Sequence, residues 1–286
     1  QRDQRGALLT PLRVTLLTYG SRGDVEPFIA LGLGLQRAGL RVRLAAPAKF
    51  EAWAAGCGLE FAPIQGNPDE LAQAFADQAG LSGLRMIGQM VRHVLPLARS
   101  VFATVEEACG DADLIVHSFM MTDAGHTAAV MRGVPEVSAQ FFPVFLTTAA
   151  FSAVAMPDLP LGPGYRRFTH WFNTSVFRHG ARFLYNFLRR SGPRLPDLAA
   201  WPFSARAGIP ILFGYSPAVL PCPADWPDYA QVCGYWRLPV PQDWQPPADL
   251  AEFLAAGTPP VYFGPGSIRS SRMKTLLQAV ITAARG

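Results

Sequence analysis

The sequence predicts an α/β fold, a mainly parallel sheet covered by helices, followed by the first part of a second unit of the same kind. Apolar runs of strand length alternate along the chain with longer amphipathic stretches, which is the pattern of such folds. The first apolar run, Val14–Thr18, passes through a glycine-bearing turn into an apolar, helix-like stretch that ends at Gly39. After a segment rich in proline and tryptophan at 235–247, the alternation starts again.

The expected strands are short apolar runs, and the expected helices are longer stretches with apolar residues at helical spacing. The strands lie at Val14–Thr18, Leu40–Ala46, Glu60–Pro63, Leu114–His117, Pro135–Ala139, Ile209–Gly214, Tyr229–Gly234 and Val261–Phe263. The helices lie at Pro27–Ala38, Lys49–Ala55, Asp69–Ala79, about Gly83–Ala108, Thr122–Arg132, Tyr165–Arg190, Leu250–Ala255 and about Arg272–Arg285. Gly39 ends the first helix, and Pro96 is expected to kink or break the fourth.

This pattern divides the chain into four parts. Residues 1–11 lack periodicity and are expected to be a leader or disordered, 12–234 form one domain, and 235–247 form an interdomain linker. Residues 248–286 start a second domain that is incomplete, because about 40 residues are too few to bury an independent core.

Composition excludes several classes of protein. Half of the 286 residues are hydrophobic, which is typical of a globular chain, and a net charge of +4 without a dense basic block argues against nucleic-acid binding. The four cysteines lie far apart, without the spacing of zinc ligands, so we expect free thiols and no metal site. Because neither a signal peptide nor an apolar stretch of roughly 18 to 20 residues is found, the sequence predicts a cytoplasmic protein. The cysteines are Cys57, Cys109, Cys222 and Cys233.

The turn after the first strand is the leading candidate site. Gly20 and Gly23 allow a tight turn, and the helix that follows directs unpaired amides and a partial positive charge at it, which suits a phosphate. Ser21 and Arg22 are either ordinary turn residues or phosphate donors. Asp24 either caps the helix or is a catalytic carboxylate at the carboxyl end of the strand, where open α/β sheets bind ligands.

Other candidates are weaker. Gly266 and Ser267 belong to a second glycine-bearing turn after the strand expected at Val261–Phe263. His117 and His126 are either structural histidines or acid–base groups, and Asp123 lies one helical turn from His126, where the two side chains can pair. A Gly-x-Ser-x-Gly elbow, a Walker motif, a His-Glu-x-x-His motif and the dinucleotide fingerprint are all absent from the sequence.

The long irregular segment 140–163 is expected to line a binding site. Its phenylalanines either form an apolar wall above Asp24 that binds a flat hydrophobic acceptor or fill the core of the domain. In the helix expected next, Phe168, Phe172 and Val176 recur at helical spacing beside arginines. This helix either faces the core with a solvated basic side or contacts anionic lipid. The wall phenylalanines are Phe141, Phe142, Phe145 and Phe151.

Several motifs resemble one enzyme family, the bacterial and fungal glycosyltransferases that act on sterols, glycopeptides and other lipophilic aglycones, which carry a UDP-glycosyltransferase-like, family 28 N-terminal domain. The resemblance rests on Thr18-Tyr19-Gly20-Ser21-Arg22-Gly23-Asp24-Val25-Glu26-Pro27-Phe28, Ala30-Leu31-Gly32-Leu33-Gly34-Leu35, Ala38-Gly39, Phe50-Glu51, Gly58-Leu59-Glu60-Phe61, Val232-Cys233-Gly234-Tyr235-Trp236 and Pro259-Pro260-Val261-Tyr262-Phe263-Gly264-Pro265-Gly266-Ser267. It covers most of the N-terminal half of such an enzyme and the first unit of the other half.

The resemblance implies two facing Rossmann-like domains, the GT-B arrangement, with residues 12–234 binding the acceptor and residues from 248 onward binding the donor. It implies a UDP- or dTDP-sugar as co-substrate, without a cofactor or metal. It also implies that Asp24 takes the proton of the acceptor hydroxyl as the anomeric centre inverts, and that Ser267 and Gly266, with Gly20, Ser21, Arg22 and Gly23, bind the donor.

The sequence departs from the family pattern at Pro265, where the family usually has phenylalanine, and it ends before the His-x-Gly-Gly segment that grips the donor. We therefore expect the acceptor half, or a truncated form, of an inverting glycosyltransferase that is cytoplasmic or peripheral to the inner face of a membrane through residues 165–190. The alternative is a non-catalytic acceptor-binding or auxiliary module whose donor site a partner chain completes. A nicotinamide-dependent oxidoreductase is disfavoured, because the glycine fingerprint is incomplete.

Overall fold

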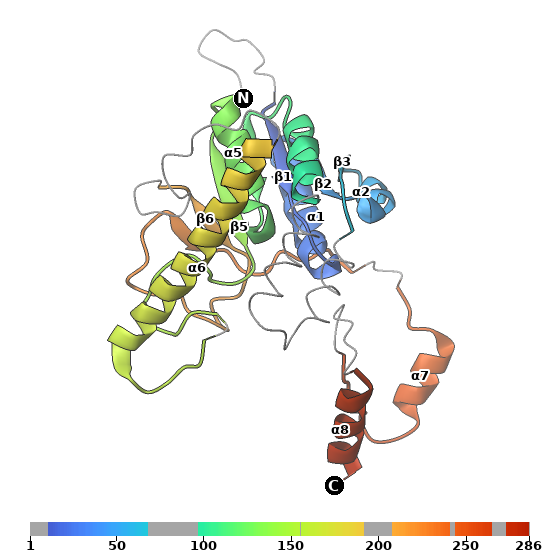
Figure 1. Ribbon diagram of the computed structural model, residues 1–286. Coiled ribbons are helices and arrows are strands. Elements are labelled where there is room, and N and C mark those ends of the chain that lie inside the picture. The colour runs from blue at the N-terminus through green and yellow to red at the C-terminus, as the bar shows by residue number, and fades with distance from the viewer. Residues whose placement is uncertain are drawn as a thin grey trace.

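A seven-stranded sheet forms the centre of the computed structural model (Figure 1), and its strands lie in the order β3-β2-β1-β4-β5-β6-β7. Every neighbouring pair runs parallel, as the sequence predicts. The strands are β1 (Arg13–Leu17), β2 (Arg41–Pro47), β3 (Glu60–Ile64), β4 (Leu114–His117), β5 (Glu136–Gln140), β6 (Ile211–Phe213) and β7 (Ala230–Val232). The structure describes residues 11–67, 97–154, 156–191, 208–240, 244–264 and 273–285.

Helices cover both faces of this sheet. On one face Leu16 of β1 packs with Phe28 and Ile29 of α1, and on the other face Leu17 packs with Met121 and Ala124, which belong to η2 and α5. Buried parallel strands read as continuous apolar runs for this reason, since both faces need apolar side chains. The helical elements are α1 (Arg22–Arg37), η1 (Ala48–Phe50), α2 (Glu51–Gly56), a helix at 97–108, η2 (Phe119–Met121), α5 (Thr122–Arg132), α6 (Gly162–Ser191), α7 (Ala248–Ala255) and α8 (Met273–Arg285).

Several predicted bounds differ from the structure by a few residues, and one helix start and one strand are wrong. Helix α1 begins at Arg22 rather than at Pro27, because Ser21 occupies the N-cap position and the Asp24 carboxylate accepts a hydrogen bond from its amide. No strand forms at Val261–Phe263, where Val261 and Tyr262 are almost fully exposed. A strand requires a neighbour, and no described residue pairs with this segment. The helices predicted at Asp69–Ala79 and over 83–96 lie outside the described residues.

Helix α6 excludes one of the two alternatives stated for it. The side chains of Phe168, Phe172 and Val176 would be buried if they faced the core, but they are 54%, 43% and 55% exposed, whereas Thr169 and His170 are buried. Two polar contacts hold the helix in this orientation. The Thr169 hydroxyl accepts a hydrogen bond from the amide of Ala153, and the His170 ring lies 3.0 Å from a loop carbonyl. The apolar stripe of α6 therefore faces outward.

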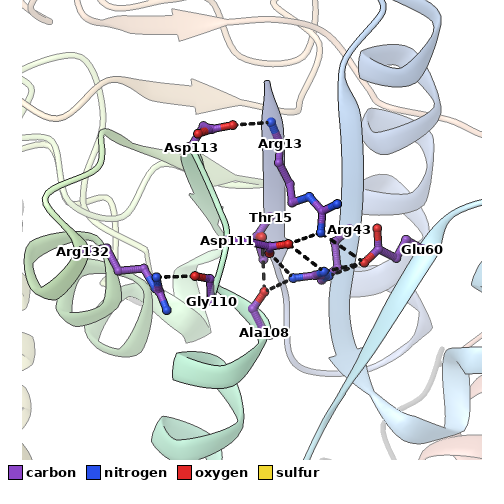
Figure 2. A network of polar contacts seen from close by, with 9 residues as sticks. All are labelled: Arg13, Thr15, Arg43, Glu60, Ala108, Gly110, Asp111, Asp113 and Arg132. Atoms are coloured by element: carbon purple, nitrogen blue, oxygen red, sulfur yellow. Dashed lines mark hydrogen bonds and ion pairs between the residues drawn. The ribbon is translucent and has the colours of Figure 1, made fainter. Parts of the chain in front are cut away.

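The amino ends of β1, β2 and β3 carry a network of paired charges (Figure 2). The Arg43 guanidinium lies 2.6 Å from carboxylate oxygens of both Asp111 and Glu60, and it also donates to the carbonyl of Ala108. Arg13 pairs with the same Asp111 carboxylate. This network joins three strands to the loop that precedes β4.

Helices α7 and α8 stand apart from the sheet (Figure 1), and α7 buries no side chain. The predicted division into 12–234, 235–247 and 248–286 stays a prediction. Among the helices that the structure describes, none combines the length and apolarity needed to cross a bilayer.

Candidate functional site

The candidate site lies at the carboxyl ends of β1 and β4. The chain builds β1, β2 and β3 in one direction and then returns to place β4 on the other side of β1. The strand order reverses there, and open α/β sheets bind their ligands at such a point, beyond the carboxyl ends of the strands. Gly20 and Ser21 lie between β1 and α1, Asp24 lies in the first turn of α1, and the segment after β4 starts at Ser118.

Gly20 is required by the position of Asp24. Its φ is +145°, a conformation that residues with a side chain rarely adopt, and a Cβ at this position would lie 2.2 Å from Asp24 Oδ2. The Thr18 hydroxyl also donates to the backbone carbonyl of Asp24 at 2.9 Å. The turn is thus built around the Asp24 side chain.

The Asp24 carboxylate is half-buried and held by one of its two oxygens. Oδ2 accepts hydrogen bonds from the Ser21 amide at 2.7 Å and from the Ser21 hydroxyl at 3.0 Å. Oδ1 receives no hydrogen bond from any residue within the described ranges. The capping contact predicted from the sequence is therefore present, and it leaves the second oxygen able to accept a proton. The catalytic role of Asp24 stays a prediction.

The start of α1 can also hold an anion. The amides of Arg22 and Gly23 lie in the first turn of a 16-residue helix, where backbone amides have no carbonyl partner within the helix. The Arg22 side chain, by contrast, points along the helix, with its Nε 3.0 Å from Glu26 and its guanidinium 4.9 Å from the ring centre of Trp53. Donor binding by Gly20, Ser21, Arg22 and Gly23 stays a prediction, and Gly266 and Ser267 lie outside the described residues.

The four predicted wall phenylalanines lie in three packing environments. Phe141 contacts Phe28 and Trp236 edge to face, whereas Phe151 packs against His170 and Trp226. Phe142 and Phe145 both contact Phe119, but Phe142 is 38% exposed and Phe145 is buried. The acceptor wall stays a prediction, and Phe142 is the member with the most accessible side chain.

Sequence reasoning missed Trp236 as a part of this edge. Trp236 lies in the segment after β7 and returns to pack on Phe28 of α1. Gly214 makes room for it, since a Cβ there would lie 3.1 Å from the indole. The only sequence signal for Trp236 was that the motif Val232-Cys233-Gly234-Tyr235-Trp236 resembles a motif of the glycosyltransferase family.

The two predicted acid–base histidines converge on a carboxylate that the sequence did not single out. His117 Nε2 lies 3.0 Å from Glu136 Oε2, and His126 Nδ1 lies 2.5 Å from Glu136 Oε1. Burial alone would raise the pKa of Glu136, but the hydrogen bonds from both histidines lower it to about 2. The predicted local pair of Asp123 and His126 is therefore replaced by the Glu136 contact, and burial raises the pKa of Asp123 to about 6.

This buried cluster fits a structural role. The His117 side chain is fully buried, so it is closed to substrate. An acidic residue at the start of a predicted strand was the available signal for Glu136. Within the ranges that the structure describes, no group of three or more histidine, cysteine or acidic side chains is arranged to hold a metal ion.

Comparison with known proteins agrees with this architecture. Residues 14–153 match the glycosyltransferase family 28 N-terminal domain. A sterol 3-beta-glucosyltransferase of Aspergillus fumigatus is 32% identical over 280 residues, covering 95% of this chain and 20% of that protein. The enzyme of the same name from Emericella nidulans is 33% identical over 277 residues, covering 95% of this chain and 20% of that protein. The chain therefore spans about one fifth of the length of these relatives.

Solved glycosyltransferase structures share the fold. The calicheamicin glycosyltransferase CalG4 superposes with a TM-score of 0.53 at 16% identity, over 84% of this chain and 56% of that chain. The glycosyltransferase of kitacinnamycin gives a TM-score of 0.52 at 16% identity, over 83% of this chain and 55% of that chain. At this level of identity the likeness establishes the Rossmann-like α/β fold and nothing further.

Proposed function

We propose, from the membership of residues 14–153 in glycosyltransferase family 28, that this chain is the acceptor half of an inverting glycosyltransferase. In this proposal the enzyme moves a sugar from a UDP- or dTDP-sugar to a hydroxyl of a lipophilic acceptor such as a sterol, lipid or natural-product aglycone. Relatives that are sterol glucosyltransferases and match 95% of this chain support the acceptor class. The observation that carries the proposal is the Asp24 carboxylate, held through Oδ2 and open at Oδ1.

The geometry of Asp24 suits a general base. Both hydrogen bonds from Ser21 hold Oδ2, so Oδ1 is the oxygen left to meet an acceptor hydroxyl. Oδ1 takes the hydroxyl proton as the oxygen attacks the anomeric carbon, and the nucleoside diphosphate leaves from the opposite side, which inverts the configuration. The partial positive charge at the start of α1 attracts the diphosphate.

Each part of the chain has a place in this proposal. Residues 12–234 bind the acceptor, and the segment from 248 onward begins the donor domain, in which Gly266 and Ser267 contact the donor. The acceptor lies against aromatic side chains, for which the half-exposed Phe142 is the best-placed candidate. We also propose peripheral contact with the inner face of a membrane, because lipophilic acceptors reside in bilayers.

Product analysis tests the proposed reaction. The full-length natural protein is incubated with a panel of nucleotide sugars and hydroxylated lipophiles, and products are identified by mass spectrometry. The expected product is a glycoside whose anomeric configuration, read by NMR coupling constants, is opposite to that of the donor. Retention of configuration would contradict the role of Asp24 as base, and acceptor binding without turnover on any donor would favour a non-catalytic acceptor-binding module.

A further inference from the structure

We propose that the outward face of α6 docks the protein onto an anionic lipid bilayer, with the helix lying in the plane of the interface. The inference rests on the proposed function, in which a lipophilic acceptor is taken from a membrane. It adds which surface of the protein contacts the membrane and that the lipids there are negatively charged. This face consists of Phe168, Trp171, Phe172 and Val176, flanked by Arg178 and Arg182.

The apolar side of this face is built from neighbouring exposed side chains. Trp171 is 60% exposed, and its ring and that of Phe172 both contact the ring of Phe168. Val176 extends the row by one helical turn and is 55% exposed. Large aromatic side chains held together in water at this exposure indicate an interaction surface, and tryptophan is favoured at the interfacial depth of a bilayer.

The charge of α6 selects the partner. The 30-residue helix contains six arginines and no acidic residue. Arg178 and Arg182 follow Trp171 at offsets of seven and eleven residues, so they lie on its side of the helix. Both are exposed, and neither forms an ion pair with a residue in the described ranges. The arginines of the helix are Arg166, Arg167, Arg178, Arg182, Arg189 and Arg190.

The opposite side of α6 is already used by the domain. Thr169 and His170 are buried against the loop that contains Phe151 and Ala153, and Arg166 pairs with Asp158 in the same loop. Figure 1 shows α6 on the β6 side of the molecule, with its first turns directed away from the sheet. Leu159 and Leu161, which directly precede the helix in sequence, are also exposed apolar residues. This division of aromatic, basic and domain-facing sides is typical of an interfacial helix.

Vesicle sedimentation without any sugar donor tests this proposal. The full-length protein is mixed with vesicles of phosphatidylcholine alone or with about one third phosphatidylglycerol, at low and high salt. We expect binding to the anionic vesicles that weakens with salt. The variant Trp171→Ala/Phe172→Ala removes apolar contacts, and Arg178→Glu/Arg182→Glu reverses two charges. Each of these two variants should lower the partition coefficient about tenfold or more. For the charge reversal, this estimate follows from roughly 1 kcal/mol per basic residue at a charged surface.

Matched controls separate this face from general stickiness and charge. Trp244→Ala removes a tryptophan that is 57% exposed outside α6, and Arg37→Glu/Arg237→Glu makes the same charge change on other exposed arginines. Neither control should change binding more than about twofold, and circular dichroism should show all variants folded. Equal vesicle binding of the wild type and the α6 variants would overturn the proposal. It would also be overturned if the wild type bound no vesicles and the α6 variants lost self-association, because the face would then join two copies of the protein. Turnover of a detergent-solubilised acceptor is measured separately, so the docking surface and the proposed reaction fail independently.

Discussion

At the amino ends of β1 to β3, charged side chains satisfy one another, whereas at the carboxyl end of β1 a single carboxylate keeps an oxygen unused. Arg43 contacts two carboxylates and a carbonyl there, and the pairing with Arg43 holds the pKa of Asp111 below its usual value despite the opposing effect of desolvation. Asp24 is held equally firmly, but by one oxygen only. The amino edge is therefore expected to contribute stability, and the carboxyl edge to contribute chemistry.

Among the changes that leave Asp24 itself in place, the largest effect is expected from Gly20→Ala at the carboxyl edge. The added Cβ would require Asp24 Oδ2, 2.2 Å away, to move, and misplacement of a catalytic group by about 1 Å costs about 100-fold in turnover. Steady-state kinetics on the full-length protein measure the loss. Gly34→Ala is the matched control. Gly34 lies on α1, the helix that follows Gly20, and a Cβ at position 34 would meet no atom within 4 Å. That control should keep wild-type turnover, and a similar loss in both variants would point to the helix rather than to Asp24.

The cluster of Glu136, His117 and His126 should contribute stability, as the charges at the amino ends of the strands do. The pKa of Glu136, about 2, is below the ordinary value of 4.5. Its contribution to stability is therefore complete above pH 4.5 and is lost as pH falls toward 2. This contribution is on the order of 3 kcal/mol of unfolding free energy. Urea unfolding between pH 2 and 7 should show the loss in wild type and a flatter profile in Glu136→Gln. Parallel profiles for the two proteins would show that the histidine contacts add nothing.

Arg43→Met should lower stability by about 1 to 3 kcal/mol, because it removes a donor that two carboxylates and a carbonyl share. Turnover per folded molecule should stay at the wild-type level. Thermal unfolding and kinetics on the same preparation check both statements. Arg41→Met, an exposed arginine on the same strand, should change stability by less than about 0.5 kcal/mol. A loss of turnover in Arg43→Met at full folding would mean that the two edges are not separate in function.

Ser21→Ala is expected to have the smallest effect. It removes the hydroxyl bond to Asp24 Oδ2 at 3.0 Å and leaves the amide bond at 2.7 Å. Loss of this cap costs about 1 kcal/mol of stability, and the looser carboxylate should lower turnover several-fold. Ser21→Thr keeps a hydroxyl and should restore both values. If the threonine variant is as slow as the alanine variant, Ser21 acts in some way other than by orienting Asp24.

The sequence predicted the sheet well because each parallel strand is a local apolar run. Leu114–His117 and Thr122–Arg132 were predicted with the bounds that the structure gives. Features that depend on distant contacts were missed. Glu136 meets His117 through the pairing of β4 with β5, and it meets His126 where α5 lies beside that pair. Trp236 contacts Phe28, from which it is more than 200 residues away in the sequence.

Helix α6 shows the same limit. Its apolar stripe was visible in the sequence, but the buried side is fixed by hydrogen bonds that Thr169 and His170 form with Ala153 and Phe151 of the loop that precedes the helix. Periodicity locates a stripe on a helix and does not say which side the domain covers. The candidate base was considered from the sequence as a cap of the helix, whereas the structure places Ser21 at the N-cap and Asp24 three residues later as its capping-box partner.

The turnover of Asp24→Asn, measured together with donor affinity, tests the central claim most directly. The substitution keeps the shape of the side chain and removes its basicity, and Glu26→Gln makes the same change two residues further along α1 as a control. We expect kcat of the full-length protein to fall about 100- to 10,000-fold, with the Kd for the nucleotide sugar nearly unchanged and the control close to wild type. Wild-type turnover in Asp24→Asn would contradict the account.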